Sequence, residues 1–125
     1  MPISCDTSRA PARVLFTITG PWPAREDVAA LRSRLMAAGQ LNESTRALFD
    51  IRSVESVPHY LEVDRIVAAA MAQGGLPLTR AYLTASVDQQ SVVGLMQSLA
   101  PATISIEMFT DEAAAFAWLV AAPVD

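Results

Sequence analysis

The chain has 125 residues, of which 52% are hydrophobic and 18% are charged, so it is long enough to form one domain around a buried core. Thirteen acidic residues against nine basic ones give a formal net charge of −4, which argues against binding to nucleic-acid phosphates or to anionic lipid. The single cysteine, Cys5, excludes an internal disulfide and a zinc site built from several cysteines.

Residues 1–12 show no clear hydrophobic period, so we expect an N-terminal arm that is either flexible or an extra edge strand. The thiol of Cys5 in this arm is expected to be incidental, because Arg9 is the arm's only basic residue. The N-terminus lacks a secretion-signal pattern, and the longest apolar run, 113–123, is too short to span a bilayer. We therefore expect a cytoplasmic protein that does not insert into membranes.

Four short strands are predicted at residues 14–19, 47–51, 81–85 and 104–109, because apolar side chains alternate within each of them. A strand buried on both faces would be a near-continuous apolar run, so this alternation predicts a sheet with helices mainly on one face. The residues expected beneath the helices are Val14, Phe16, Ile18, Ala47, Phe49, Ile51, Ala81, Leu83, Ile104, Ile106 and Met108.

A segment with helical periodicity follows each strand. The first is expected to begin at Pro23 and to end at Gly39. The second covers roughly 59–73, and in the third Ser86 and Gln89 fit a capping box. The last begins at the helix-start signal Thr110, Asp111 and Glu112.

Strand–helix–strand units imply parallel pairing with right-handed crossovers. We therefore predict a single α/β domain over residues 13–122. Its four-stranded, largely parallel β-sheet would be built as a (βα)n superhelix, with helices mainly on one face.

The loops at the carboxyl ends of the strands are the first place to look for a site, because ligands of open parallel sheets bind there. The candidate residues at this edge are Trp22, Asp50, Arg52, Ser53, His59, Ser86 and Asp88. Asp50 and His59 could form an acid–base pair, although an aspartate here more often accepts loop N–H groups and a histidine near a helix start is more often solvated or a cap. Trp22 could line a ligand pocket or pack on Val28 of the next helix.

Other site chemistries find little support in the sequence. His59, Glu62 and Asp64 form a weak metal set without a second histidine, and a polar helix face explains them better. No glycine-rich phosphate loop follows a strand, and no serine lies in a G-x-S-x-G context. The sequence therefore predicts no catalytic residue, no cofactor and no metal site.

Two segments resemble a known family. The segment 48–55, LFDIRSVE, resembles the strand–aspartate–loop of STAS domains, the anti-sigma-factor-antagonist fold. The run 108–113, MFTDEA, followed by Trp118 and Leu119, is similar to the ending of short bacterial STAS-like proteins grouped with the CRAL-TRIO lipid-carrier superfamily. The order of elements matches from about residue 13 to 120, and the resemblance implies a β–α superhelix with a parallel sheet.

The resemblance also implies where regulation would occur. Regulatory STAS domains carry a phosphoacceptor serine in an Asp-Ser-Ser-Gly-like run at a helix start. The corresponding stretch here, 56–61, reads SVPHYL and contains no such run and no glycine. Ser53 and Ser56 belong to the preceding loop, so a serine phosphoswitch is not expected.

The second face of the predicted sheet is a candidate contact surface for a homodimer or another protein partner. The alternative is that residues 1–12 fold back over it. The residues expected on this face are Leu15, Thr17, Leu48, Tyr82, Thr84, Glu107 and Phe109.

The leading functional hypothesis is a non-catalytic, cytoplasmic STAS-like interaction or regulatory module. One alternative is a carrier of a small apolar or lipid-like ligand, by analogy with CRAL-TRIO proteins, which requires a buried cavity of at least a few hundred Å³. A second alternative is an enzyme that uses Asp50 and His59.

Because the acceptor run is absent, incubation with bacterial anti-sigma-type kinases should leave the chain unmodified. Intact-mass spectrometry measures this, and a regulatory STAS domain that carries the run serves as the positive control. Stoichiometric phosphate on Ser53 or Ser56 would contradict the prediction.

Overall fold

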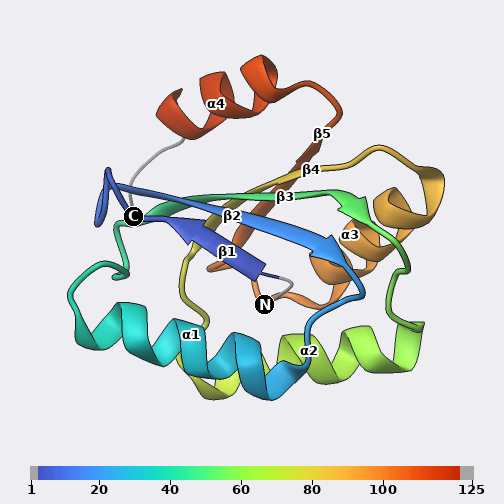
Figure 1. Cartoon of the computed structure of the whole chain (residues 1–125), viewed down its shortest axis with the longest axis horizontal. Helices are drawn as coiled ribbons and strands as arrows, with labels where there is room; N and C mark the ends of the chain where they lie inside the picture. Colours follow the sequence, from blue (N-terminus) through green and yellow to red (C-terminus); the bar gives the residue numbers. More distant parts are fainter. Residues whose placement is uncertain (1–2, 122–125) are drawn as a thin grey trace.

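The computed structural model describes residues 3–121, which form one five-stranded sheet and four helices (Figure 1). The strands are β1 (Ile3–Asp6), β2 (Arg13–Gly20), β3 (Arg46–Val54), β4 (Thr79–Leu83) and β5 (Ser105–Phe109). The helices are α1 (Arg25–Ala37), α2 (Tyr60–Ala72), α3 (Val87–Leu99) and α4 (Glu112–Ala121). The predicted α/β architecture with a largely parallel sheet is therefore confirmed.

The sheet has five strands rather than the predicted four, and the fifth is an edge strand in the N-terminal arm, one of the two expectations for residues 1–12. Strand order follows the chain, from β1 to β5, with β1 antiparallel to β2 and the other neighbours parallel. The additional strand, β1, lies in the N-terminal arm and pairs Ile3 with Ile18 and Cys5 with Phe16. Its four residues are too few for a recognisable period, but pairing at the edge buries Ile3 in the core.

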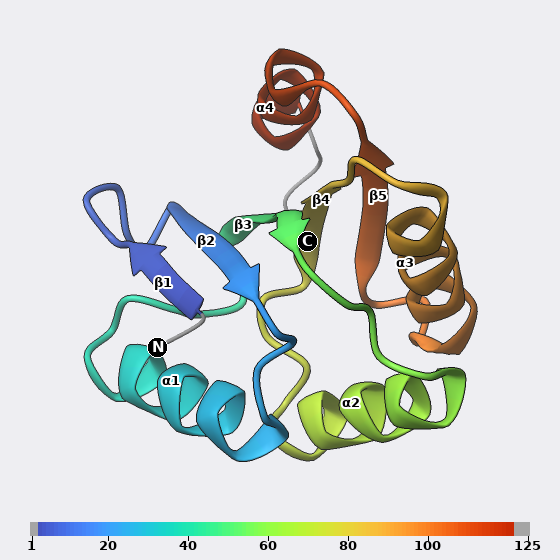
Figure 2. The ribbon, with the colours of Figure 1, turned by 45° about the vertical axis from the view of Figure 1, so that its right-hand side comes forward.

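Helices cover both faces of the sheet, unequally. Helices α1, α2 and α3 lie on one side, and α4 lies on the other (Figures 1 and 2). Helix α4 packs mainly on β3, β4 and β5, and the guanidinium of Arg13 on β2 lies 5.5 Å from the ring centre of Phe116 on α4. The part of this face nearest β1 is not covered by a helix. The helices are thus mainly on one face, as predicted, but the second face is not open over the centre of the sheet.

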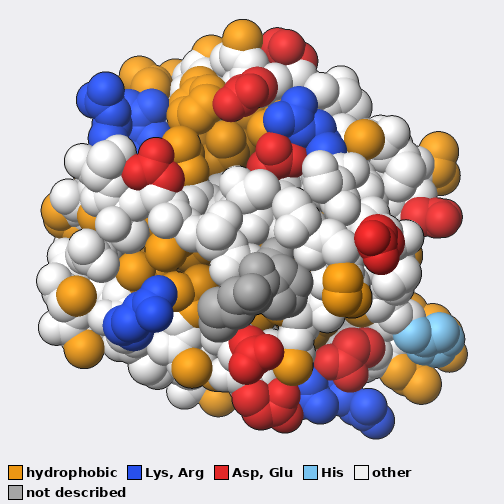
Figure 3. All heavy atoms as spheres, viewed as in Figure 1, with side chains coloured by type: hydrophobic (Ala, Val, Ile, Leu, Met, Phe, Trp, Pro, Cys, Tyr) orange, Lys and Arg blue, Asp and Glu red, His pale blue; other side chains and the backbone are white. Residues whose placement is uncertain are grey.

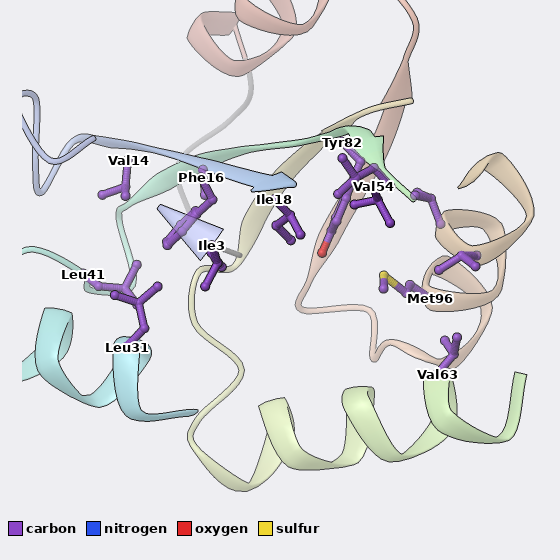
Figure 4. Close-up of a cluster of buried hydrophobic side chains, with 14 of the residues drawn as sticks. Ile3, Val14, Phe16, Ile18, Leu31, Leu41, Val54, Val63, Tyr82 and Met96 are labelled. Atoms are coloured by element: carbon purple, nitrogen blue, oxygen red, sulfur yellow. The ribbon is translucent and has the colours of Figure 1, made fainter. Parts of the chain in front are cut away.

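The main core fills the space between the sheet and helices α1, α2 and α3. Val14, Phe16 and Ile18 of β2 point into this space, together with Leu31 from α1 and Met96 from α3 (Figure 4). These side chains are all buried. Removing their apolar surface from water, at about 25 cal/mol per Å², stabilises the fold.

A second, smaller core corrects the predicted faces of β4. Leu48, Ala81 and Leu83 pack against Ala115 and Leu119 of α4 rather than beneath the other helices. Parallel pairing places Tyr82 level with Phe49 and Met108, so Tyr82 lies on the α1–α3 face. The prediction that Ala81 and Leu83 share the face of Phe49 was wrong, because a strand buried on both sides carries no usable alternation.

Local signals position the helix starts as the sequence predicts. The Ser86 hydroxyl accepts a hydrogen bond from the Gln89 N–H at 3.1 Å, which confirms the cap of α3. The side chain of Gln89 reaches back one residue further than in the usual capping box and accepts from the Ala85 N–H at 2.7 Å. The Asp111 carboxylate accepts from the Ala114 N–H at the start of α4.

None of the helices within residues 3–121 has the length and apolar character needed to cross a bilayer.

The docking of α4 can be tested with two adjacent residues. Leu119 is buried against the sheet and Val120 is exposed, while Arg46 donates to the backbone carbonyl of each at 2.6 and 2.9 Å. Leu119→Ala should lower the free energy of unfolding by about 2–5 kcal/mol, because it leaves a cavity under α4. Val120→Ala should change it by about 0.5 kcal/mol or less. Equal effects of the two variants in urea unfolding would mean that α4 does not pack on the sheet.

Candidate functional site

Asp50 and Arg52 form a salt bridge at the carboxyl end of β3. Nε and Nη2 of Arg52 donate to the Asp50 carboxylate at 3.0 and 2.9 Å, and the Arg52 backbone N–H donates to it at 3.1 Å. The side-chain hydrogen bonds hold the pKa of the Asp50 carboxyl below its usual range, although partial burial acts in the opposite direction. The same carboxylate raises the pKa of Arg52, and Glu112 at the start of α4 lies 3.9 Å from its guanidinium.

His59 acts as the N-cap of α2. Its Nδ1 accepts a hydrogen bond from the Leu61 N–H at 3.3 Å, and its ring centroid lies 4.3 Å from that of Tyr60. Within residues 3–121, no hydrogen bond or ion pair joins His59 to Asp50, and each has other partners. The same part of the chain contains no group of three or more His, Cys, Asp or Glu side chains that could hold a metal ion.

The remaining predicted edge residues have separate positions. Ser86 caps α3, Asp88 is exposed in the first turn of that helix, and Ser53 is exposed on β3. Trp22 lies on the opposite side of the sheet from α4, where it is half-buried and lines a cavity with Val28. The edge therefore does not assemble the predicted residues into one site.

The predicted contact surface on the second sheet face is largely buried or polar. Leu48 is buried under α4, and Tyr82 and Thr84 are buried as well, Tyr82 on the other face. Leu15 and Phe109 are half-buried beside α4, while Thr17 and Glu107 are exposed. The prediction of an open apolar face was wrong, because α4 packs on its apolar residues.

The structure instead reveals a cavity of about 70 Å³ between the sheet and helices α1 and α2. Most of its wall is apolar, and Figure 4 shows Ile3, Ile18 and Tyr82 pointing into this region from the sheet. The lining residues are Ile3, Ile18, Trp22, Pro23, Val28, Arg32, Phe49, Ile66, Val67, Ala70, Met71, Arg80, Tyr82, Met96, Ala100, Ile104 and Ile106.

Arg80 on β4 brings one positive charge to this cavity, although only 8% of the residue is exposed. Its Nε donates to the Pro77 carbonyl at 2.8 Å, and its Nη2 donates to the Gly75 carbonyl at 3.1 Å. The guanidinium carbon lies 5.8 Å from the centre of the Phe49 ring. Gly75 has a φ of +75°, and a Cβ there would lie 3.0 Å from Met71, so a glycine is needed to present this carbonyl.

Arg32 on α1 brings a second positive charge. Its Nη1 donates to Oε1 of Gln73 at the end of α2, while Nε2 of Gln73 donates to the Ala29 carbonyl and the Ser33 hydroxyl of α1. Burial lowers the pKa of Arg32 to about 10, and the nearby Arg80 charge acts in the same direction. Among residues 3–121, neither arginine forms an ion pair with a carboxylate.

The sequence reasoning missed both arginines. Arg32 lies four residues after Val28 and next to Leu31, which places it near the buried side of the predicted helix. Arg80 lies two residues before Tyr82, on the same face of a buried strand. A charged residue at a position where the hydrophobic pattern predicts an apolar one could have identified both arginines from the sequence.

A second feature lies where α2 and α3 begin. A groove between these helices is lined by Val57, Pro58, Tyr60, Val63, Asp88, Ser91, Val92 and Leu95. Three large apolar residues are exposed on this end of the molecule, Tyr60 at 64%, Leu61 at 54% and Val87 at 75%. Figure 3 shows hydrophobic side chains beside the histidine at this end.

No protein-family model matches the chain, and no curated protein matches it significantly in sequence. A solved structure does resemble it: an uncharacterised protein of the DUF3478 family from Shewanella loihica PV-4, described as having a SpoIIAA-like fold. The two superpose with a TM-score of 0.64 at 20% sequence identity, over 94% of this chain and 91% of the other. The chain therefore has a SpoIIAA-like fold, the STAS-type arrangement that the strand–aspartate–loop segment predicts.

Proposed function

We propose that the chain is a non-catalytic, cytoplasmic protein-interaction module of STAS-like fold, without a serine phosphoswitch. The observation that supports this proposal most directly is the exposure of Tyr60, Leu61 and Val87 at the starts of α2 and α3, where Tyr60 lines the groove between the two helices. The resemblance to regulatory STAS domains implies that this helix start is their control point. Here it carries apolar side chains in place of the acceptor run.

The apolar residues form a suitable centre for an interface. Single exposed apolar residues are normal on a protein surface, but three large ones at the starts of two adjacent helices, next to a groove, are unusual. Tyrosine is enriched among the residues that carry most of the binding energy at interfaces. Covering Tyr60, Leu61 and Val87 would remove apolar surface from water at about 25 cal/mol per Å².

Charge indicates the chemistry of the partner. Glu55, Asp64 and Asp88 are exposed near the starts of α2 and α3, whereas Arg25 and Arg65 are both held by Glu62, at 2.8 and 3.7 Å. The rim is therefore acidic, and it would repel a second copy of the same surface. We infer that the partner is a different protein that inserts an apolar side chain into the groove and flanks it with basic residues.

The two alternative functions have less support. A cavity of about 70 Å³ is far smaller than the roughly 300–1,000 Å³ of typical ligand sites, so it does not suit a lipid carrier. An enzyme that uses Asp50 and His59 would need the two groups to converge on a substrate. Asp50 is instead bound by Arg52, and His59 caps α2.

The pKa of Asp50 provides a test of the non-catalytic role. In the folded chain this carboxyl should titrate below its ordinary value of about 3.9, because Arg52 stabilises the charged form. The pair therefore stabilises the fold at neutral pH, and that contribution is lost as the pH falls through the lowered pKa. Arg52→Met should raise the pKa in an NMR titration, whereas Arg65→Met should not. A carboxyl that titrates near neutral pH would favour the enzyme.

The interaction surface can be tested by photo-crosslinking in the native host. A photoreactive amino acid in place of Leu61 should give one discrete adduct with another protein, because this exposed position follows Tyr60, which lines the groove. The same amino acid in place of Val120, which is 66% exposed against 54% for Leu61 but lies on α4, should not give that adduct. Val87→Glu should abolish the adduct at position 61, since it places a charge in the apolar centre.

Two outcomes would contradict the proposal. Equal adducts at positions 61 and 120 would mean that the groove is not a specific contact surface. An adduct with a second copy of the chain would show that the surface forms a homodimer rather than binding a different protein. Sedimentation of the purified protein would then give the mass of that dimer.

A further inference from the structure

We propose that the cavity between the sheet and helices α1 and α2 binds a small organic carboxylate, with Arg32 and Arg80 as its anion-binding residues and a short apolar body against the surrounding wall. This site is separate from the interaction groove, and it does not depend on the proposed function.

The two arginines leave positive charge without a counter-ion in the cavity. Buried charges in proteins are normally paired, because removing an ion from water is costly. Arg80 is held by backbone carbonyls through Nε and Nη2, and within residues 3–121 its Nη1 has no acceptor. Arg32 donates to Gln73 through Nη1, and its Nε and Nη2 have no acceptor in the same part of the chain. Unused guanidinium N–H groups therefore remain on both residues.

The shape and chemistry of the wall select the class of anion. A guanidinium offers parallel N–H groups that match the two oxygens of a carboxylate. The rest of the wall is mostly apolar and includes Ile3, Ile18, Val28, Ile66 and Val67, which suits a hydrocarbon body. Inorganic phosphate would place polar oxygens against this wall, so a carboxylate with a hydrocarbon body fits better.

The volume limits the length of the ligand. The cavity measures about 70 Å³, and each water-sized group takes about 10–15 Å³ on this scale, so about five to seven such groups fit. Butyrate, with four carbons and two oxygens, lies in this range, whereas a fatty acid of membrane length does not. The phenol of Tyr82 and the indole of Trp22 also line the cavity and are the other side chains there with polar N–H or O–H groups.

A smaller hollow adjoins the cavity between helices α1 and α2. The hollow is lined by Trp22, Pro23, Val28, Arg32 and Ile66, all of which also line the cavity, together with Arg25 and Ala69. Arg25 at the start of α1 is bound to Glu62 on α2 at 2.8 Å. The Arg32 side chain thus borders both spaces, where an incoming anion would meet it.

The test is a titration of the full chain with sodium butyrate, with butyramide as the neutral ligand of matched shape. We expect butyrate to bind saturably and to raise Tm, and butyramide to do neither. Arg32→Met should raise the Kd for butyrate at least about tenfold, because it removes a charge-assisted hydrogen bond. Arg34→Met, an exposed arginine two residues along the same helix, should leave the Kd unchanged within about a factor of two.

Two further measurements separate ligand binding from a structural role. Without ligand, Arg32→Met should have a Tm no lower than that of the wild type, because an apolar side chain replaces a partly buried cation that has no carboxylate partner among residues 3–121. In the wild type, butyrate should shift the NMR signals of the Nε–H groups of Arg32 and Arg80, but not that of Arg34. These signals do not depend on whether any variant folds.

Three results would overturn the proposal. The first is equal binding of butyrate and butyramide, which would show that charge is not recognised. The second is an unchanged affinity in Arg32→Met, or unshifted Arg32 and Arg80 signals in the wild type. The third is saturable binding of inorganic phosphate that displaces butyrate at lower concentration, which would make the site a phosphate site.

Discussion

The stacked rings of Phe16, Phe49 and Tyr82 align the three central strands of the sheet. The ring centroids lie 4.7 Å apart between β2 and β3 and 4.8 Å apart between β3 and β4, with planes tilted by only 10° and 12°. This spacing equals the distance between neighbouring strands, so the rings can stack only when the three residues are level in the parallel register. A shift of any strand by one residue would move its ring to the other face and lose the stack.

This stack determines where charge and space occur. Because Tyr82 is level with Phe49, Arg80 two residues earlier lies on the same face, and its guanidinium lies over the Phe49 ring. The stacked rings form a flat surface across three strands, and side chains of α1 and α2 pack on it incompletely. The space left between them is the cavity. Phe49 is half-buried because it lines this cavity.

The sequence predicted what depends on local period and capping. The parallel strands, the cap at Ser86 and the start of α4 follow from patterns of three to six residues. The side of the sheet that α4 covers does not follow from such a pattern. Residues 81–84 are buried on both faces of the sheet, so the pattern fits with either set of alternate residues facing α4. Two pairings also depend on long-range or side-chain contacts that the pattern does not decide. The sequence left open whether the arm is flexible or an edge strand, and β1 forms because β2 offers it an edge. The Asp50 carboxylate is occupied because the Arg52 side chain donates to it.

A structural role explains Arg80 but not Arg32. Arg80 holds the loop between α2 and β4 through the carbonyls of Gly75 and Pro77, so the fold needs its guanidinium. Arg32 makes one hydrogen bond among residues 3–121, to Gln73, and Gln73 is bound to α1 through Ala29 and Ser33 as well. A leucine or methionine at position 32 would pack on the same apolar wall and avoid the cost of partly burying a cation. The fold alone therefore does not account for Arg32. A charged side chain at a position that favours an apolar one is expected where a protein binds a ligand.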